Sequence, residues 1–279
     1  TVTLLIENEN DLPKLTPKQR SVVDLLFDVN TASVSEICEL CSVGTSVLKN
    51  LEKYGVISIF DKEIYRNPYK NIEVKEQKKI ELTFEQSNAY DTYSNMLLNG
   101  GGSGLLYGVT GSGKTQVYLK LIDKALENDR DVIVLVPEIS LTPQVLSIFH
   151  ARYGDKVAVF HSGLSLGERN DEYKRADRGE AKIVIGTRSA VFAPLHNLGL
   201  IIMDEEQENT YKSERTPKYN TKDVAHFRCK YNKALFLMTS ATPSLEAYSN
   251  ALKGKYVLCE LNERFGDAKL PHVITVDMK

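Results

Sequence analysis

A glycine-rich segment at 108–115 ends in Lys114 and Thr115 and directly follows the apolar residues Leu105 and Leu106. Its spacing, Gly-x4-Gly-Lys-Thr, is that of a phosphate-binding loop between a strand and a helix. Glycines let backbone N–H groups turn toward a phosphate, which the positive end of the following helix also attracts. We expect Lys114 to reach the outer phosphates and Thr115 to bind magnesium. The predicted nucleotide loop consists of Gly108, Val109, Thr110, Gly111, Ser112, Gly113, Lys114 and Thr115.

An acidic cluster follows the apolar run at 200–203. Phosphoryl transfer needs charge neutralisation and a positioned water, and two adjacent carboxylates can contribute to both. We expect Asp204 to hold Mg²⁺ and Glu205 to orient and deprotonate the attacking water. An acidic cluster after a strand is usually a solvated turn, but a phosphate-binding loop in the same predicted sheet favours catalysis. The predicted catalytic residues are Lys114, Asp204 and Glu205, and the predicted magnesium ligands are Thr115 and Asp204.

Strands and helices alternate after the loop, and they must position these residues. The predicted helices span 115–127, 143–152, 166–178, 221–231 and 243–252, and the strands span 132–136, 157–160, 183–185, 200–203 and 234–238. Apolar strands separated by helices predict an α/β fold, a RecA-like parallel sheet with helices on both faces. Ligands then gather at the carboxyl ends of the strands, where the polar motifs occur. A further helix is expected to begin near Thr83, and 100–104 is expected to be a flexible turn.

The first 67 residues have a different pattern. Helices are expected from Pro17, after 33–35 and from Thr45, followed by a hairpin of strands at 56–60 and 63–65. This order predicts a small winged-helix domain, whose third helix commonly enters a DNA groove. Charge favours DNA contact weakly, because 49–79 holds eight basic and five acidic residues. The predicted domains are the end of a preceding segment (1–12), the winged helix (13–67), a linker (68–80), the ATP-binding lobe (81–262) and a connection to a second lobe (263–279).

Composition excludes several other classes. The chain of 279 residues is 42% hydrophobic and 26% charged, as in an ordinary globular protein, and its net charge of −2 gives no global reason to bind nucleic acid. No segment has the length and apolarity of a membrane span, so we expect a cytoplasmic protein without a membrane partner. Four scattered cysteines do not form a disulfide framework. Cys38 and Cys41 could form half of a zinc site, but no second pair follows, and we expect them on a buried helix face.

Motifs along 81–279 resemble those of the superfamily 2 helicases, and in particular the replication-restart helicases among them. Phe84, Glu85 and Gln86 match the adenine-reading motif, and the nucleotide loop is motif I. Further matches are VPEISLT at 136–142, FHSGLS at 160–165, GTRSAVFAPL at 186–195, DEEQ at 204–207, which is motif II, and SATPS at 240–244, which is motif III. The preceding winged helix agrees with the order of domains in that family.

The resemblance implies the first lobe of an ATP-dependent 3′-to-5′ DNA helicase with Mg²⁺ as cofactor. Implied partners are single-stranded and forked DNA, primosome proteins and single-strand-binding protein. We expect the chain to be a fragment, so that the second lobe with its arginine finger and the family's zinc cluster lie outside it. Gln86 is the expected adenine contact. Expected coupling residues are Gln207, Ser240 and Thr242, with the two hydroxyls bonded to the carboxylates of motif II.

The expected DNA contacts lie at strand ends and in a loop that resembles the family's aromatic-rich loop. They are His161, Ser162, Thr187, Arg188, Tyr211, Lys212 and Lys218. The segment 212–233 holds seven basic and two acidic residues, which suits a surface that follows phosphates, with tyrosines for base stacking. An exposed charged loop without a ligand is the alternative interpretation of this segment.

One residue departs from the family pattern. The fourth position of motif II is usually His, and here it is Gln207. A Gln side chain can still hydrogen-bond motif III, so we expect hydrolysis to be retained, while coupling to DNA is open.

Two other functions stay possible at this point: a different superfamily 2 DNA translocase, and an ATP-gated winged-helix regulator that binds DNA but does not translocate.

Overall fold

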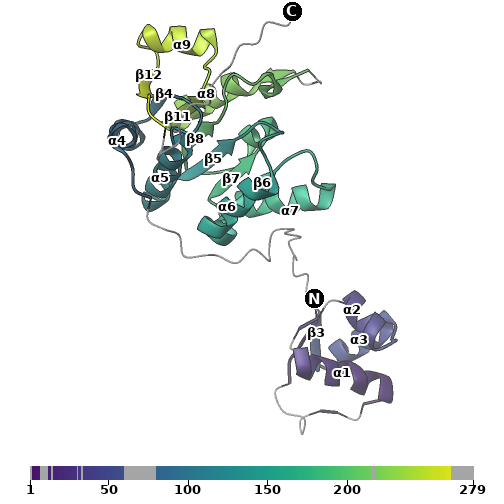
Figure 1. The fold of residues 1–279 in the computed structure, drawn as a ribbon. Coiled ribbons are helices and arrows are strands. Elements are labelled where there is room, and N and C mark those ends of the chain that lie inside the picture. Colours follow the sequence, from purple (N-terminus) through teal and green to yellow (C-terminus); the bar gives the residue numbers. More distant parts are fainter. Residues whose placement is uncertain are drawn as a thin grey trace, which may run out of the picture. The chain divides into compact units, whose positions relative to one another are not determined.

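The computed structural model describes residues 2–6, 12–13, 15–29, 31–32, 34–59, 80–214, 216 and 218–264. The chain divides into two compact units, residues 1–64 and residues 65–279. Figure 1 shows the first unit in purple and the second in blue to yellow. Each unit has its own hydrophobic core.

The first unit combines three helices with a small antiparallel sheet. Its elements are β1 (Val2–Leu4), α1 (Pro17–Val29), β2 (Thr31–Ala32), α2 (Val34–Leu40), α3 (Thr45–Lys53) and β3 (Ile57–Ile59). The three helices followed by a strand agree with the predicted order, while β1 and β2 were not part of the predicted winged helix. The second strand of the predicted hairpin, at 63–65, and the predicted linker, apart from residue 80, lie outside the described residues.

The first strand corrects one predicted boundary. Residues 1–12 were expected to end a preceding segment, but β1 is the central strand of the sheet, with β2 and β3 antiparallel on either side. Val2 is completely buried in the same core as Leu26 and Leu48. The N-terminal strand is therefore part of the first unit.

The second unit contains a seven-stranded sheet in the order β12-β4-β11-β8-β5-β7-β6, and all of its neighbouring strands are parallel. The strands are β4 (Gly102–Gly108), β5 (Asp131–Leu135), β6 (Val157–Phe160), β7 (Ile183–Gly186), β8 (Leu198–Met203), β11 (Leu235–Ser240) and β12 (Val257–Leu261). The α-helices are α4 (Phe84–Leu98), α5 (Lys114–Glu127), α6 (Pro143–Tyr153), α7 (Leu166–Asp177), α8 (Thr221–Asn232) and α9 (Leu245–Leu252). The predicted α/β fold is confirmed.

Both faces of this sheet are buried, as the apolar strands require. One core packs α4, α5 and α6 against one face, and the other packs α7, α8 and α9 against the opposite face. Successive strand residues alternate between them, so that Ile133 belongs to one core and Val134 to the other. Three short 3-10 helices lie at Gly154–Lys156, Arg188–Phe192 and Asn209–Tyr211, and β9 (Lys212–Ser213) pairs with β10 (Tyr219–Asn220).

The glycine run at 100–104 is not the flexible turn that was expected. Its last three residues open β4, and Gly102 donates its N–H to the carbonyl of Ala234 at 3.2 Å. A Cβ at Gly101 would lie 2.1 Å from the Ala234 oxygen, and a Cβ at Gly104 would lie 2.4 Å from the ring of Tyr93. These glycines therefore allow close packing at the start of a strand.

Candidate nucleotide site and its connections

The predicted phosphate-binding loop connects β4 directly to the N-terminus of α5. Gly111 and Gly113 have φ angles of 83° and 81°, in the left-handed region that glycine adopts without strain. A Cβ at Gly108 would lie 2.6 Å from Oγ of Ser112. The loop is thus a tight turn at the positive end of a 14-residue helix, a geometry suited to an anion.

Lys114 is the cation at this turn. Its Nζ donates to the carbonyl oxygens of Gly108 at 2.6 Å and Val109 at 3.2 Å, so the loop holds its own lysine. Burial lowers the pKa of Lys114, while the carboxylates of Asp204 and Glu205 act in the opposite direction. The electrostatic influence of both carboxylates indicates that the loop and the acidic cluster form one site.

The acidic cluster follows β8 in a constrained turn. The N–H of Glu205 donates to Oδ1 of Asp204 at 3.0 Å, and Glu205 has a φ of 48°, which is unusual for a residue with a side chain. Burial raises the pKa of Glu205, the charges of Asp204 and Glu208 raise it further, and Lys114 and a hydrogen bond from Ser140 lower it. A carboxylate with a raised pKa beside a phosphate-binding loop is suited to accept a proton from water.

Two tyrosines support Asp204, and neither was predicted to do so. The Tyr211 hydroxyl lies 2.6 Å from the Asp204 carbonyl and 3.0 Å from that of Leu135. Burial raises the pKa of Tyr118, and Asp204, to which its hydroxyl is hydrogen-bonded, raises it further. Tyr211 is only 3% exposed, so the expectation that its ring stacks on DNA is wrong for this structure. Its polar and charged neighbours in sequence suggested a surface loop, but the hydroxyl donates to two backbone carbonyls inside the unit.

Gln86 lies beneath the nucleotide loop. It is 1% exposed, and its side-chain oxygen accepts the N–H of Thr83 at 3.0 Å as part of a capping box on α4. Its side-chain nitrogen donates to the carbonyl of Ser112 at 2.9 Å. The structure therefore shows Gln86 fastening the loop to α4, and its contact with adenine stays a prediction.

Two of the predicted coupling residues, Ser240 and Thr242, lie at the end of β11 and just after it. Ser240 Oγ donates to Oε1 of Gln207 at 2.6 Å, and the N–H of Thr242 donates to the same Ser240 oxygen at 2.9 Å. The expected bonds from Ser240 and Thr242 to the motif II carboxylates are not the ones observed. The Thr239 hydroxyl, one residue before motif III, donates to Asp204 instead. Strand alternation explains this, because neighbouring residues of β11 point to opposite faces.

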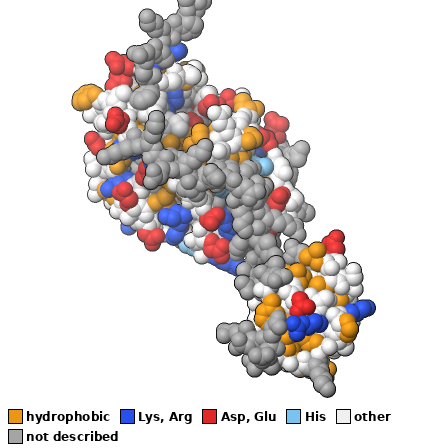
Figure 2. Space-filling view, turned by 60° about the horizontal axis from the view of Figure 1, so that its bottom comes forward, with side chains coloured by type: hydrophobic (Ala, Val, Ile, Leu, Met, Phe, Trp, Pro, Cys, Tyr) orange, Lys and Arg blue, Asp and Glu red, His pale blue; other side chains and the backbone are white. Residues whose placement is uncertain are grey.

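The remaining predicted DNA contacts differ in exposure. Ser162, Lys212 and Lys218 are exposed, His161 and Arg188 are half-buried, and Thr187 is buried. Ser162 donates its hydroxyl to Glu138, and Arg188 donates to the Lys212 carbonyl at 3.2 Å. Burial lowers the pKa of His161. Figure 2 shows acidic and basic side chains interspersed on the visible face of this unit, so any contact with a polyanion depends on local residues.

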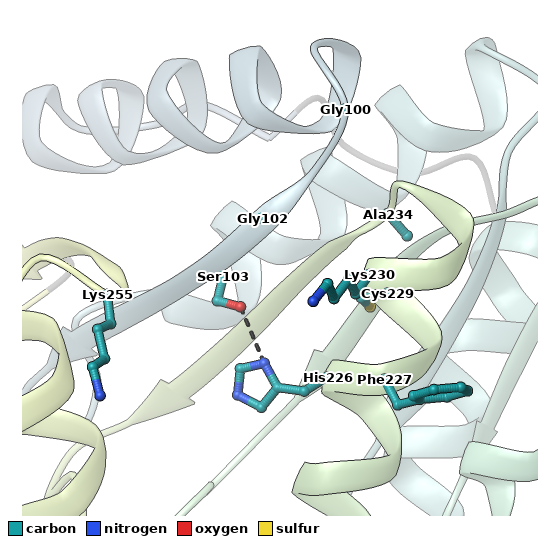
Figure 3. Close-up of a pocket in the computed structure, with 9 residues that line it drawn as sticks. All are labelled: Gly100, Gly102, Ser103, His226, Phe227, Cys229, Lys230, Ala234 and Lys255. Carbon is teal, nitrogen blue, oxygen red and sulfur yellow. Dashed lines mark hydrogen bonds between the residues drawn. The ribbon is translucent and has the colours of Figure 1, made fainter.

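One pocket lies at the opposite edge of the sheet from the nucleotide loop. It encloses about 470 Å³ where β4 and β11 begin, and Figure 3 shows His226 and Lys230 of α8 beside it, with a hydrogen bond between His226 and Ser103. Its lining includes none of the predicted site residues.

The described residues contain no cluster of three or more His, Cys, Asp or Glu arranged for a metal, and no helix among them is long and apolar enough to span a membrane.

Comparison with known proteins decides the family. The DEAD/DEAH box helicase model matches residues 86–251, more than half of the chain. The chain belongs to this helicase family. The match starts at Gln86 and includes the nucleotide loop, the acidic cluster and motif III, so the helicase resemblance predicted from the motifs is confirmed.

Individual proteins show a more specific similarity than the family model does. The chain is 40% identical to replication restart protein PriA of Bacillus subtilis (strain 168), over 99% of its own length and 35% of that protein. It is 47% identical to PriA of Chlamydia trachomatis, over 71% of its own length and 26% of that protein. It thus spans about a third of the length of the first of these helicases, and the predicted relation to replication-restart helicases is confirmed. A solved structure of RecG bound to a three-way DNA junction shares the fold, with a TM-score of 0.51, 19% identity and coverage of 91% of this chain and 31% of that one.

Proposed function

We propose that this chain is the ATP-binding lobe of an ATP-dependent DNA helicase that acts with 3′-to-5′ polarity in replication restart. The observation that carries the proposal is the convergence of Lys114, Asp204 and Glu205 at one edge of the sheet, with both carboxylates acting on the charge of the lysine. The similarity to PriA along nearly the whole chain supports replication restart as the setting.

The residues of the site have separate tasks in this proposal. The loop N–H groups and Lys114 bind the phosphates, and Lys114 exchanges its bonds to Gly108 and Val109 for phosphate oxygens. Thr115 and Asp204 would hold Mg²⁺, which neutralises phosphate charge when bound. Thr115 is exposed beside the loop and Asp204 keeps partial exposure, which fits two protein ligands whose remaining positions are filled by phosphate and water. Glu205 orients the attacking water and accepts its proton.

Contact with DNA would use exposed groups around the same sheet edge. Lys212, Lys218 and Ser162 offer donors to phosphate oxygens, and Arg188 could join them by giving up its bond to the Lys212 carbonyl. Single-stranded and forked DNA are the proposed substrates. Primosome proteins and single-strand-binding protein are proposed partners on the basis of the family resemblance alone.

Strand separation by the full-length protein tests this proposal. Forked duplexes with only a 3′ or only a 5′ single-stranded arm would be incubated with ATP and Mg²⁺, with the Lys114→Ala variant as the control. Unwinding only of the substrate that permits 3′-to-5′ movement, lost in the variant, supports the helicase. ATP-dependent movement without unwinding would favour a translocase, and ATP-dependent binding without movement would favour a regulator.

A further inference from the structure

The third residue of the acidic cluster, Glu206, has a different environment from the two residues before it. It is 3% exposed, and its backbone N–H donates to the Thr239 carbonyl at 3.1 Å. Its Oε1 accepts the N–H of Ser244 at 2.6 Å, and its Oε2 accepts the Ser244 hydroxyl at 3.1 Å. The same Oε2 forms an ion pair with Nζ of Lys222. All of these partners lie more than 15 positions away in sequence or on another strand.

These partners connect the carboxylate to two helix N-termini. Ser244 is the N-cap of α9, so the carboxylate lies where the helix dipole favours negative charge. Lys222 lies in the first turn of α8. One buried side chain therefore fixes the starts of two helices to the end of β8, directly beside Asp204 and Glu205.

The first turn of α8 leads on to the residues proposed to meet DNA. The N–H of Lys222 donates to the N-cap Asn220 at 3.0 Å, and Asn220 pairs with Lys212 across β10 and β9. Arg188 donates to the Lys212 carbonyl at 3.2 Å. An ion pair, two hydrogen bonds and a strand pair thus form a continuous path from the acidic cluster to this basic segment, through Glu206, Lys222, Asn220, Lys212 and Arg188.

We propose that Glu206 is a positioning residue that transmits changes at Asp204 and Glu205 to α8 and to the strand pair β9 and β10. A displacement of the turn at 204–207 on nucleotide binding moves the Glu206 carboxylate, and the ion pair moves Lys222 with it. The turn also connects to motif III, through the contact between Gln207 and Ser240 and through the bonds from Ser244 to Glu206, whereas the ion pair with Lys222 is its connection to α8. The inference deepens the proposed function and rests on it.

The charge of Glu206, rather than its hydrogen bonds to Ser244, carries the link to α8. Glu206→Gln keeps an oxygen for the Ser244 donors but loses the ion pair, and Lys222→Met removes the same ion pair from the other side. Lys222→Arg retains a cation and serves as the conservative variant. Asp123→Asn, which breaks a comparable half-buried ion pair with Arg152 between α5 and α6, controls for a loss of stability alone.

The experiment compares the ratio of ATP turnover with and without single-stranded DNA in the full-length protein, together with the melting temperature. We expect Glu206→Gln and Lys222→Met each to lower this ratio at least about fivefold, the double variant to be no worse than either single one, and Lys222→Arg and Asp123→Asn to retain the ratio. An unchanged ratio in both single variants overturns the inference about Glu206 but not the proposed function. The same holds if the ratio falls in Asp123→Asn as well, in proportion to the loss of melting temperature. Absence of DNA stimulation in the unaltered protein overturns the proposed function and this inference with it.

Discussion

The hydroxyl of Ser240 donates a 2.6 Å hydrogen bond to the side-chain oxygen of Gln207, and it also accepts the N–H of Thr242 at 2.9 Å. Ser240 is fully buried at the end of β11, and Gln207 closes the turn after β8. The two residues therefore join motifs II and III through a neutral contact. Since an amide oxygen accepts the bond, the contact does not depend on a charged residue at position 207.

Replacing Ser240 with Ala should weaken this connection. The change leaves the Gln207 oxygen and the Thr242 N–H without their partner, at a cost of about 1 kcal/mol, because Gln207 is half-buried and Thr242 is exposed. We expect the DNA-stimulated rate of ATP hydrolysis to fall by about fivefold or more relative to the basal rate. Steady-state turnover with and without single-stranded DNA measures this ratio. A Thr92→Ala variant, which removes a hydroxyl of α4 that donates to the Asn88 carbonyl at 2.8 Å, provides the comparison, and equal ratios in both would contradict the coupling role.

Lys114→Ala should abolish nucleotide-dependent activity while the protein stays folded. In the structure Lys114 is half-buried and bonds to carbonyls of its own loop, so the folded state loses little when it is removed. Its charge on the phosphates is needed in the transition state, where loss of one strong donor typically costs about 10²- to 10³-fold in rate. Turnover at saturating ATP and a melting curve together test this. Unimpaired turnover would sink the assignment of the loop.

The pKa of Glu205 predicts how activity depends on pH. Because burial and Asp204 raise this pKa, the carboxylate loses its base form at a higher pH than an ordinary Glu, and the rate should decline on the acid side accordingly. The hydrogen bond from Ser140 lowers the pKa, so Ser140→Ala should move the acid limb of the pH–rate profile upward. Profiles of kcat for the two proteins measure the shift. A limb that moves downward, or no limb below neutral pH, would rule out Glu205 as the titrating base.

Much of the second unit could be predicted from sequence, because most of its strands are largely apolar and alternate with helices along much of the segment. The strand 157–160 was predicted with its observed ends, and the loop before Lys114 occurs where expected. The convergence of Lys114 and Asp204 followed from topology alone, since parallel strands bring their carboxyl ends to one edge.

Other features depend on contacts between distant residues, which a local pattern does not reveal. β1 has three residues and exists through its pairing with β2 and β3. Tyr211 has a polar sequence environment, and its burial depends on packing in one of the two sheet cores and on the carbonyl oxygens of Leu135 and Asp204. For Gly104, the determining neighbour is the Tyr93 ring on α4.

Gly104→Ala should destabilise the second unit through steric overlap rather than backbone strain. The added Cβ would lie 2.4 Å from the ring of Tyr93, which is completely buried and bonds to the Val257 carbonyl at 3.2 Å. Overpacking of this kind costs about 1 to 3 kcal/mol. Gly179→Ala is the comparison, since it adds a Cβ in open space at a φ of 72° and costs only backbone strain. Denaturant unfolding measures the free energy of unfolding of both variants. If Gly104→Ala were as stable as Gly179→Ala, β4 would have shifted to accommodate the methyl group.

The last prediction separates the exposed lysines of the loop from its buried tyrosine. Lys212 and Lys218 are exposed, so replacing both with Ala should weaken binding of single-stranded DNA without lowering stability. If each contacts one phosphate, the slope of log affinity against log salt should decrease by about 0.7 for each lysine. Tyr211→Phe should lower stability and leave DNA binding unchanged. It removes the hydroxyl that donates to the Asp204 carbonyl, at a cost of about 1 kcal/mol of stability, and the salt slope should stay the same. Fluorescence anisotropy over a range of salt concentrations and thermal unfolding measure the two effects. A Tyr211→Phe variant with a smaller salt slope, or a lysine variant with an unchanged one, would refute this division of roles.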